Sequence, residues 1–87
     1  MKNTKELVKK LVKKYNTNNP FILSEKLDIT VKYLHQNLVQ DGFYTEIDGK
    51  NYIFIREDLP IANKTFVCAR ELGRYLIINQ NKNHITS

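Results

Sequence analysis

The chain has 87 residues, 41% of them hydrophobic, and carries a net charge of +5. This length fits one domain with one modest core, and the composition excludes a disordered chain. No apolar run approaches the ~20 residues of a membrane span, and lysines interrupt the N-terminus where a secretory signal would be apolar, so a cytoplasmic protein without membrane contact is predicted.

The excess charge belongs to the first segment, residues 1–15, which is predicted to form a basic amphipathic helix from about residue 4. Its apolar arc consists of Leu7, Val8, Leu11, Val12 and Tyr15. The other face carries lysines that are candidates for binding nucleic acid or an acidic partner, namely Lys5, Lys9, Lys10, Lys13 and Lys14. A solvated face that aids solubility is the alternative, since no arginine or aromatic residue on it favours base contacts.

The middle of the chain alternates between helix and strand signals. Asn19-Pro20 is typical of an N-cap followed by proline at the first helical position, so a short helix is predicted from Pro20 to about Leu27. Residues 29–34 are rich in β-branched side chains and predict a strand. Residues 43–47 and 52–56 flank Asp48-Gly49, a strong hairpin signal.

A long helix over residues 60–78 and a polar tail over residues 79–87 complete the predicted chain. The fold class is therefore α+β: two N-terminal helices, a small three-stranded antiparallel or mixed sheet with a β-hairpin, and a long C-terminal helix. We find no internal repeat or linker, so residues 1–87 are predicted to form a single domain.

The long helix has one apolar face and one polar notch. Its apolar face, predicted to be buried, consists on a helical wheel of Leu72, Leu76, Ala69, Ala62 and Phe66. Arg70 and Arg74 lie one turn apart on the opposite side, with Glu71 at their flank. One interpretation of this notch is a structural salt bridge from Glu71 to Arg74. The other is a positively charged cleft that binds an acidic loop or a phosphate.

Zinc metallopeptidases place His-Glu-x-x-His in the frame of this notch, with two imidazoles on the metal and the glutamate as base. Arginine stands here at both histidine positions, and a guanidinium group has five donors, a permanent charge and no lone pair for a metal. The remaining nitrogen or sulfur ligands, Cys68, His35 and His84, match no known metal-site spacing. We therefore predict no metal, no cofactor and no catalytic residue.

The order of several motifs over residues 5–78 resembles the ImmA/IrrE family of metallopeptidase-like proteins from phages, mobile elements and bacteria. The matching features are Tyr15 ahead of the asparagine-rich link, Asn19-Pro20-Phe21, Gly42-Phe43-Tyr44, Asp48-Gly49 and Phe66-Val67-Cys68-Ala69. Members of that family cleave regulatory repressors, often helix-turn-helix proteins encoded beside them. The resemblance implies a protein that acts in the cytoplasm of a bacterial host cell.

Carried over to this sequence, the resemblance places Arg70 and Arg74 at the two zinc-ligand positions and Glu71 at the position of the general base. Ile78 stands where many members have a further histidine, and a later ligand helix has no counterpart before Ser87. The resemblance thus implies an inactive homologue, with residues 60–78 as a degenerate active-site helix and not an enzyme.

The expected function is that of a non-catalytic phage or mobile-element protein that binds and inhibits or regulates a bacterial protein. The target would be a repressor or a defence nuclease, as with anti-CRISPR proteins, and Arg70 and Arg74 join the lysines as binding candidates. The alternatives are a nucleic-acid-binding module that uses the lysine-rich helix and a residual metallopeptidase.

Overall fold

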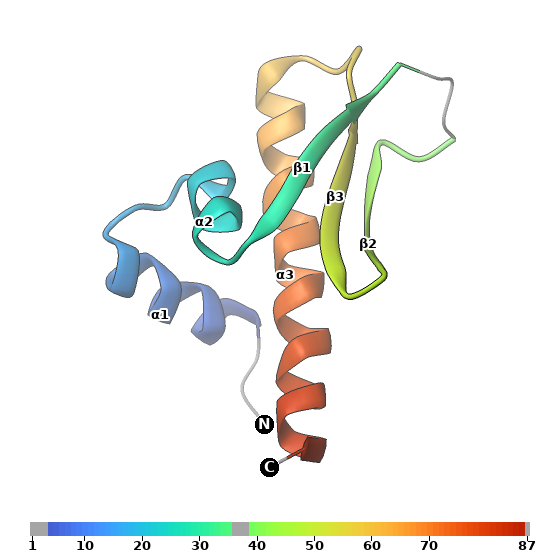
Figure 1. Cartoon of the computed structure of the whole chain (residues 1–87). Coiled ribbons are helices and arrows are strands. Elements are labelled where there is room, and N and C mark those ends of the chain that lie inside the picture. Colours follow the sequence, from blue (N-terminus) through green and yellow to red (C-terminus); the bar gives the residue numbers. More distant parts are fainter. Residues whose placement is uncertain (1–3, 36–38, 87) are drawn as a thin grey trace.

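The computed structural model describes residues 4–35 and 39–86, with side chains as far as residue 80. Its elements are α1 (Thr4–Tyr15), α2 (Pro20–Lys26), β1 (Ile29–Leu34), β2 (Gly42–Ile47), β3 (Lys50–Arg56) and α3 (Ile61–Thr86). The three strands form one sheet that packs against α3 (Figure 1). Among the described residues α1 contacts α2 and α3 but no strand. The α+β prediction is confirmed.

The sheet is mixed, in the order β1-β3-β2. β1 runs parallel to β3 from Ile29 opposite Asn51 onward, and β2 runs antiparallel to β3. The predicted hairpin is confirmed: Asp48 and Gly49 both have positive φ, at 51° and 80°, as a two-residue turn of the I′ type requires. β1 and β2 are therefore the two edges of the sheet.

The start of α2 follows the predicted capping pattern. The Asn19 side chain accepts hydrogen bonds from the backbone N–H groups of Phe21 and Ile22, at 2.9 and 3.4 Å, and Pro20 occupies the first helical turn. These contacts satisfy helix donors that would otherwise have no partner. The cap holds α2 in place so that Leu23 enters the core.

The core lies between the sheet and the helices. Its buried apolar residues come from α2, from the inward positions of β1 and β3, and from α3: Leu23, Ile29, Ile53, Ile55, Val67, Cys68 and Leu72. Burial raises the pKa of the Cys68 thiol, which lies 3.8 Å from the Ser24 hydroxyl. Cys68 is thus a small core side chain.

The helical wheel placed the buried face of α3 only partly correctly. Leu72 is buried and Leu76 packs against the core, as predicted. Phe66 is 65% exposed, however, and Ala62 and Ala69 are also exposed. Glu71 is buried instead, at 2% exposed. The wheel placed Glu71 at the surface because Glu71 is charged. In the structure, hydrogen-bonding and ion-pair partners compensate the charge of Glu71, so the side of α3 that carries it can face the sheet.

The predicted end of the last helix is also wrong. α3 continues through residues 79–86, which were expected to form a polar tail. No proline or glycine in this stretch stops the helix, and the Asn79 side chain donates to the Tyr75 carbonyl at 2.9 Å. Within the described part of the chain, no helix combines the length and apolarity needed to cross a bilayer.

Candidate functional site

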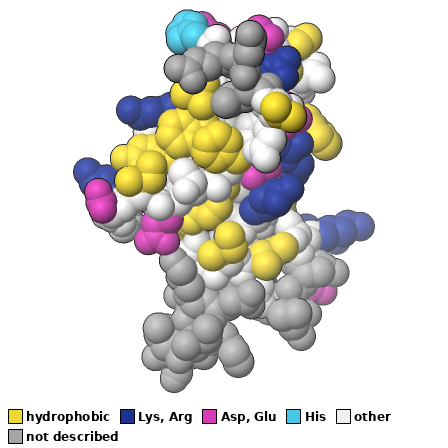
Figure 2. Space-filling model, turned by 90° about the vertical axis from the view of Figure 1, so that its right-hand side faces the viewer, with side chains coloured by type: hydrophobic (Ala, Val, Ile, Leu, Met, Phe, Trp, Pro, Cys, Tyr) yellow, Lys and Arg dark blue, Asp and Glu magenta, His cyan; other side chains and the backbone are white. Residues whose placement is uncertain are grey.

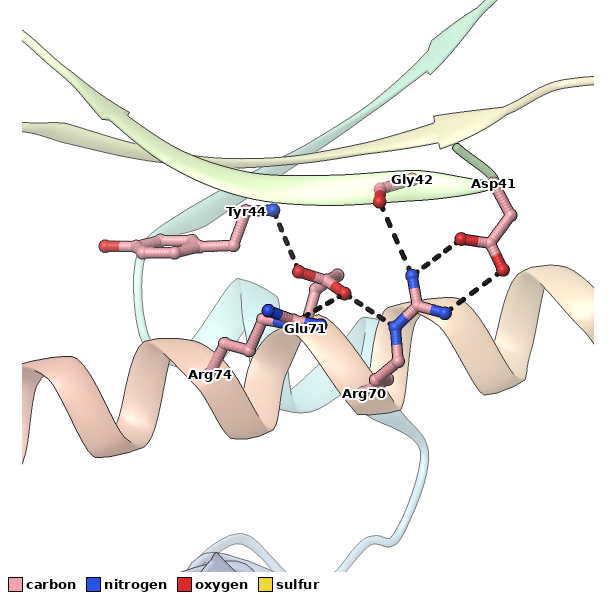
Figure 3. Close-up of polar contacts among 6 residues, drawn as sticks. All are labelled: Asp41, Gly42, Tyr44, Arg70, Glu71 and Arg74. Carbon is pink, nitrogen blue, oxygen red and sulfur yellow. Dashed lines mark hydrogen bonds and ion pairs between the residues drawn. The ribbon is translucent and has the colours of Figure 1, made fainter. Parts of the chain in front are cut away.

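The site is built around the buried carboxylate of Glu71, which three donors hold (Figure 3). One oxygen accepts from the Tyr44 backbone N–H at 3.0 Å. The other accepts from Nε of Arg70 at 2.7 Å and pairs with Nε of Arg74 at 3.2 Å. The predicted ion pair between Glu71 and Arg74 is confirmed, and Arg70 makes the shorter of the two contacts.

Arg70 continues the network toward the loop before β2. Its two terminal nitrogens bind both oxygens of Asp41, at 3.1 and 2.6 Å, and one of them also donates to the Gly42 carbonyl at 3.4 Å. The hydrogen bond from Arg70 is the main cause that lowers the pKa of Asp41 below its usual value. The hydrogen bonds to Asp41 and then to Glu71 raise the pKa of Arg70. We call these residues, with Tyr44 and Arg74, the Glu71 network.

The Glu71 network covers part of an open sheet edge. β2 is an edge strand, and its outward backbone groups at Gly42 and Tyr44 meet side chains of α3 where another strand would otherwise pair. Such edges invite unwanted pairing unless something blocks them. Glycine is needed at position 42 because β2 lies close to β3 and α3 there. An added Cβ would lie 2.5 Å from the Phe54 carbonyl oxygen and 2.6 Å from a Val67 methyl carbon.

The helix–strand junction borders a groove of about 700 Å³. Arg70, Glu71, Arg74 and Ile78 line it from α3, and the segment from Val39 to Tyr44 lines it from the β2 side. Arg74 is the most exposed charged side chain of the network, at 64%, whereas Arg70 is 31% exposed. Because Arg70 is held by Asp41, Gly42 and Glu71, the arginine available to a ligand in this groove is Arg74.

The lysine candidates lie on a different surface. Lys5, Lys9, Lys10, Lys13 and Lys14 are exposed on α1. In Figure 1, α1 and β2 lie on opposite sides of α3, and α1 contacts no described strand. The structure therefore separates the lysines from Arg70 and Arg74, so a single ligand of small size cannot contact both sets.

The potential metal ligands are not brought together. In the described part of the chain, no group of three or more histidine, cysteine, aspartate or glutamate residues is placed to hold a metal ion. Cys68 is enclosed in the core, and His35 lies beside Glu57 at 2.7 Å, beyond the end of β1. The side chain of His84 lies outside the described residues.

Sequence reasoning missed Asp41 and the backbone of Tyr44. Both are distant from α3 in sequence, and only the folded sheet brings them to Arg70 and Glu71. No spacing rule in the sequence links these positions to Arg70 and Glu71. The arrangement neutralises Glu71 and offers a positively charged donor in an open groove.

The fold and site thus define a small α+β protein with an arginine–carboxylate network. No family model matches the chain, and no solved structure matches it. The chain is similar to an uncharacterized immunity region protein of Bacillus phage phi105, with 41% identity over 71 residues. That match covers 79% of this chain and 44% of the phage protein, so the chain spans less than half of its relative's length.

Proposed function

We propose that this chain is a non-catalytic regulatory binding protein of a phage or mobile element, derived from an ImmA/IrrE-like metallopeptidase whose chemistry it has lost. The likeness to a phage protein named for its immunity region supports a regulatory role in a phage. The named role of that relative extends to this chain only as part of this proposal.

The observation that carries the proposal is the state of Glu71. A general base needs an oxygen that can take a proton from water, and in metallopeptidases a zinc ion first acidifies that water. Glu71 instead accepts from Tyr44, Arg70 and Arg74, with two guanidinium groups beside it at the motif positions of the metal ligands. This arrangement supports an ancestral active site converted into a structural ion-pair network.

The groove beside this network is the proposed binding surface. Arg74 offers charged donors there, and Val39, Phe43 and Ile78 supply apolar surface around it. A partner that inserts an acidic side chain with an apolar neighbour would match both features. A repressor encoded beside the gene is the first target to test, and a bacterial defence nuclease is the second.

The test combines binding and cleavage. The purified chain is titrated with the repressor encoded beside its gene in a calorimeter, and the mixture is followed by mass spectrometry. We expect binding without cleavage, a loss of roughly tenfold or more in affinity for Arg74→Ala, and less than one zinc per ten chains by elemental analysis. Arg56→Ala is the matched control, since Arg56 also lines the groove but is paired with Asp58 at 2.7 Å.

Cleavage of the repressor together with about one metal ion per chain would contradict the proposal and favour the residual metallopeptidase. Binding of neither target would remove its support. The nucleic-acid alternative rests on the exposed lysines of α1. It predicts tight, salt-sensitive binding of bare duplex DNA. Changing Lys9 and Lys13 to glutamate should abolish that binding, whereas Arg74→Ala should leave it intact.

A further inference from the structure

The outward face of the sheet, turned away from the helices, carries aromatic rings that the core does not use. Alternation along the strands directs Ile53 and Ile55 of β3 into the core, so Tyr52 and Phe54 point to the other side. Phe43 of β2 lies directly opposite Phe54 and shares this face. Within the described part of the chain, none of these three rings belongs to the core cluster or packs against it.

The three rings form one continuous aromatic surface. The centroids of Phe43 and Phe54 are 5.1 Å apart with an angle of 32° between the planes. The centroids of Tyr52 and Phe54 are 5.8 Å apart with an angle of 20°. Figure 2 shows hydrophobic side chains gathered in a patch, with Lys, Arg, Asp and Glu side chains at its margins. We call the three rings the aromatic surface.

The charged side chains at the outward positions of the three strands have one sign. Lys32 of β1 lies opposite Phe54, and the outward positions of β3 begin with Lys50 and end with Arg56. Lys32 and Lys50 are exposed. No aspartate or glutamate occupies an outward position of β1, β2 or β3, all of whose residues are described. Asp58, which follows β3, pairs with Arg56 and leaves the two lysines as the main cations of the face.

We propose that the outward face of the sheet binds single-stranded nucleic acid, with bases stacked on the aromatic surface and the backbone phosphates near Lys32 and Lys50. Rings on adjacent strands of an open sheet provide stacking surfaces for unpaired bases, and lysines beside them neutralise phosphates. In a duplex the flat faces of the bases are stacked on one another, so a duplex could interact with this face only through its phosphate charges. The aromatic surface shares Phe43 with the groove at Arg74, but Tyr52, Phe54, Lys32 and Lys50 are not among the residues that line that groove.

The charge pattern favours nucleic acid over a protein partner. A protein segment or a second copy of the chain would cover the rings equally well, but neither calls for cations without acids at the outward positions. This face also differs from the lysine face of α1, where the described residues show one contact between a lysine and an aromatic ring, Lys14 over Tyr15. The aromatic surface therefore combines the two features, rings and cations, that single-strand binding needs.

The test is fluorescence anisotropy with labelled oligonucleotides of about 12 nucleotides, oligo-dT and oligo-rU, and a mixed-sequence duplex of the same length. We expect at least roughly tenfold tighter binding of the single strands than of the duplex. The double variant Phe43→Leu and Phe54→Leu keeps apolar bulk but removes two rings, and should weaken binding roughly 5- to 150-fold per stacked base. Phe66→Leu, at an exposed phenylalanine of α3, is the matched control and should change nothing.

A second pair of variants keeps the test open if the double leucine variant does not fold. Lys32→Ala should lower the slope of log affinity against log salt by about 0.7 for each lost phosphate contact, and Lys9→Ala should leave the slope unchanged. Equal affinity for duplex and single strands overturns the proposal, as does an unchanged affinity in the folded double leucine variant. The face would be assigned to self-association instead if the wild-type protein sediments as a dimer, the double leucine variant sediments as a monomer, and neither binds the oligonucleotides.

Discussion

Glu71→Gln should destabilise this protein, because the Glu71 carboxylate is buried and held by three donors. The replacement removes the charge-assisted hydrogen bond to Arg70, which costs about 1.5–3 kcal/mol of stability. It also turns an amide N–H₂ toward either Arg70 or the Tyr44 N–H. One donor is then left without an acceptor, which costs about 1–3 kcal/mol more. The contact with Arg74 adds little because that side chain is 64% exposed.

Because Arg70 is itself partly exposed, we expect the lower end of this range, about 3 kcal/mol lost from the free energy of unfolding. For a domain of this size such a loss lowers Tm by about 12–24 °C. Urea unfolding followed by circular dichroism at neutral pH measures it. Glu25→Gln, at an exposed glutamate of α2, is the control and should stay within about 0.5 kcal/mol of wild type.

The opposite result would refute the reasoning. A working base is held ready for substrate at some cost in stability, so its replacement is commonly neutral or stabilising. If Glu71→Gln changes the free energy of unfolding by less than about 0.5 kcal/mol or raises it, Glu71 is not a structural ion-pair partner. The proposal that an ancestral active site became a structural network would then be refuted as well.

Three further predictions concern the fold around the Glu71 network. Leu72→Ala should cost about 2–5 kcal/mol in urea unfolding, because Leu72 is 2% exposed; a loss below about 0.5 kcal/mol would mean that α3 faces another way. Gly42→Ala should lower Tm or prevent folding, since its Cβ would collide with the Phe54 carbonyl and with Val67, and wild-type stability would contradict that packing. Arg70 lowers the pKa of Asp41 in the folded state, so the stability from this pair is present above the unfolded pKa of about 3.9 and is lost as the pH falls through the folded pKa. Acid titrations should therefore show a smaller loss below about pH 5 in Asp41→Asn than in wild type, and an equal loss would remove Asp41 from the network.

The local elements of this fold were predictable because short-range rules decide them. Asn19 and Pro20 specify a capped helix start through side-chain and φ constraints, and Asp48-Gly49 specifies a tight hairpin because both residues adopt positive φ. The amphipathic pattern likewise placed α1, whose Leu11 and Tyr15 pack against the core. The sequence also located the Glu71–Arg74 pair, since side chains three residues apart on a helix are neighbours.

The tertiary structure decided which side of α3 is buried, how the strands are ordered and what holds Arg70. The helical wheel counts apolar side chains, so it exposed Glu71 and buried Phe66, the reverse of the folded state. The cost of burying the Glu71 carboxylate is offset only when the Tyr44 N–H of β2 donates to it and Asp41 orients Arg70. Tyr44 and Asp41 are both far from Glu71 in the chain. Sequence alone therefore determined the local elements, while the partners of Glu71 depended on contacts between distant segments that no local pattern encodes.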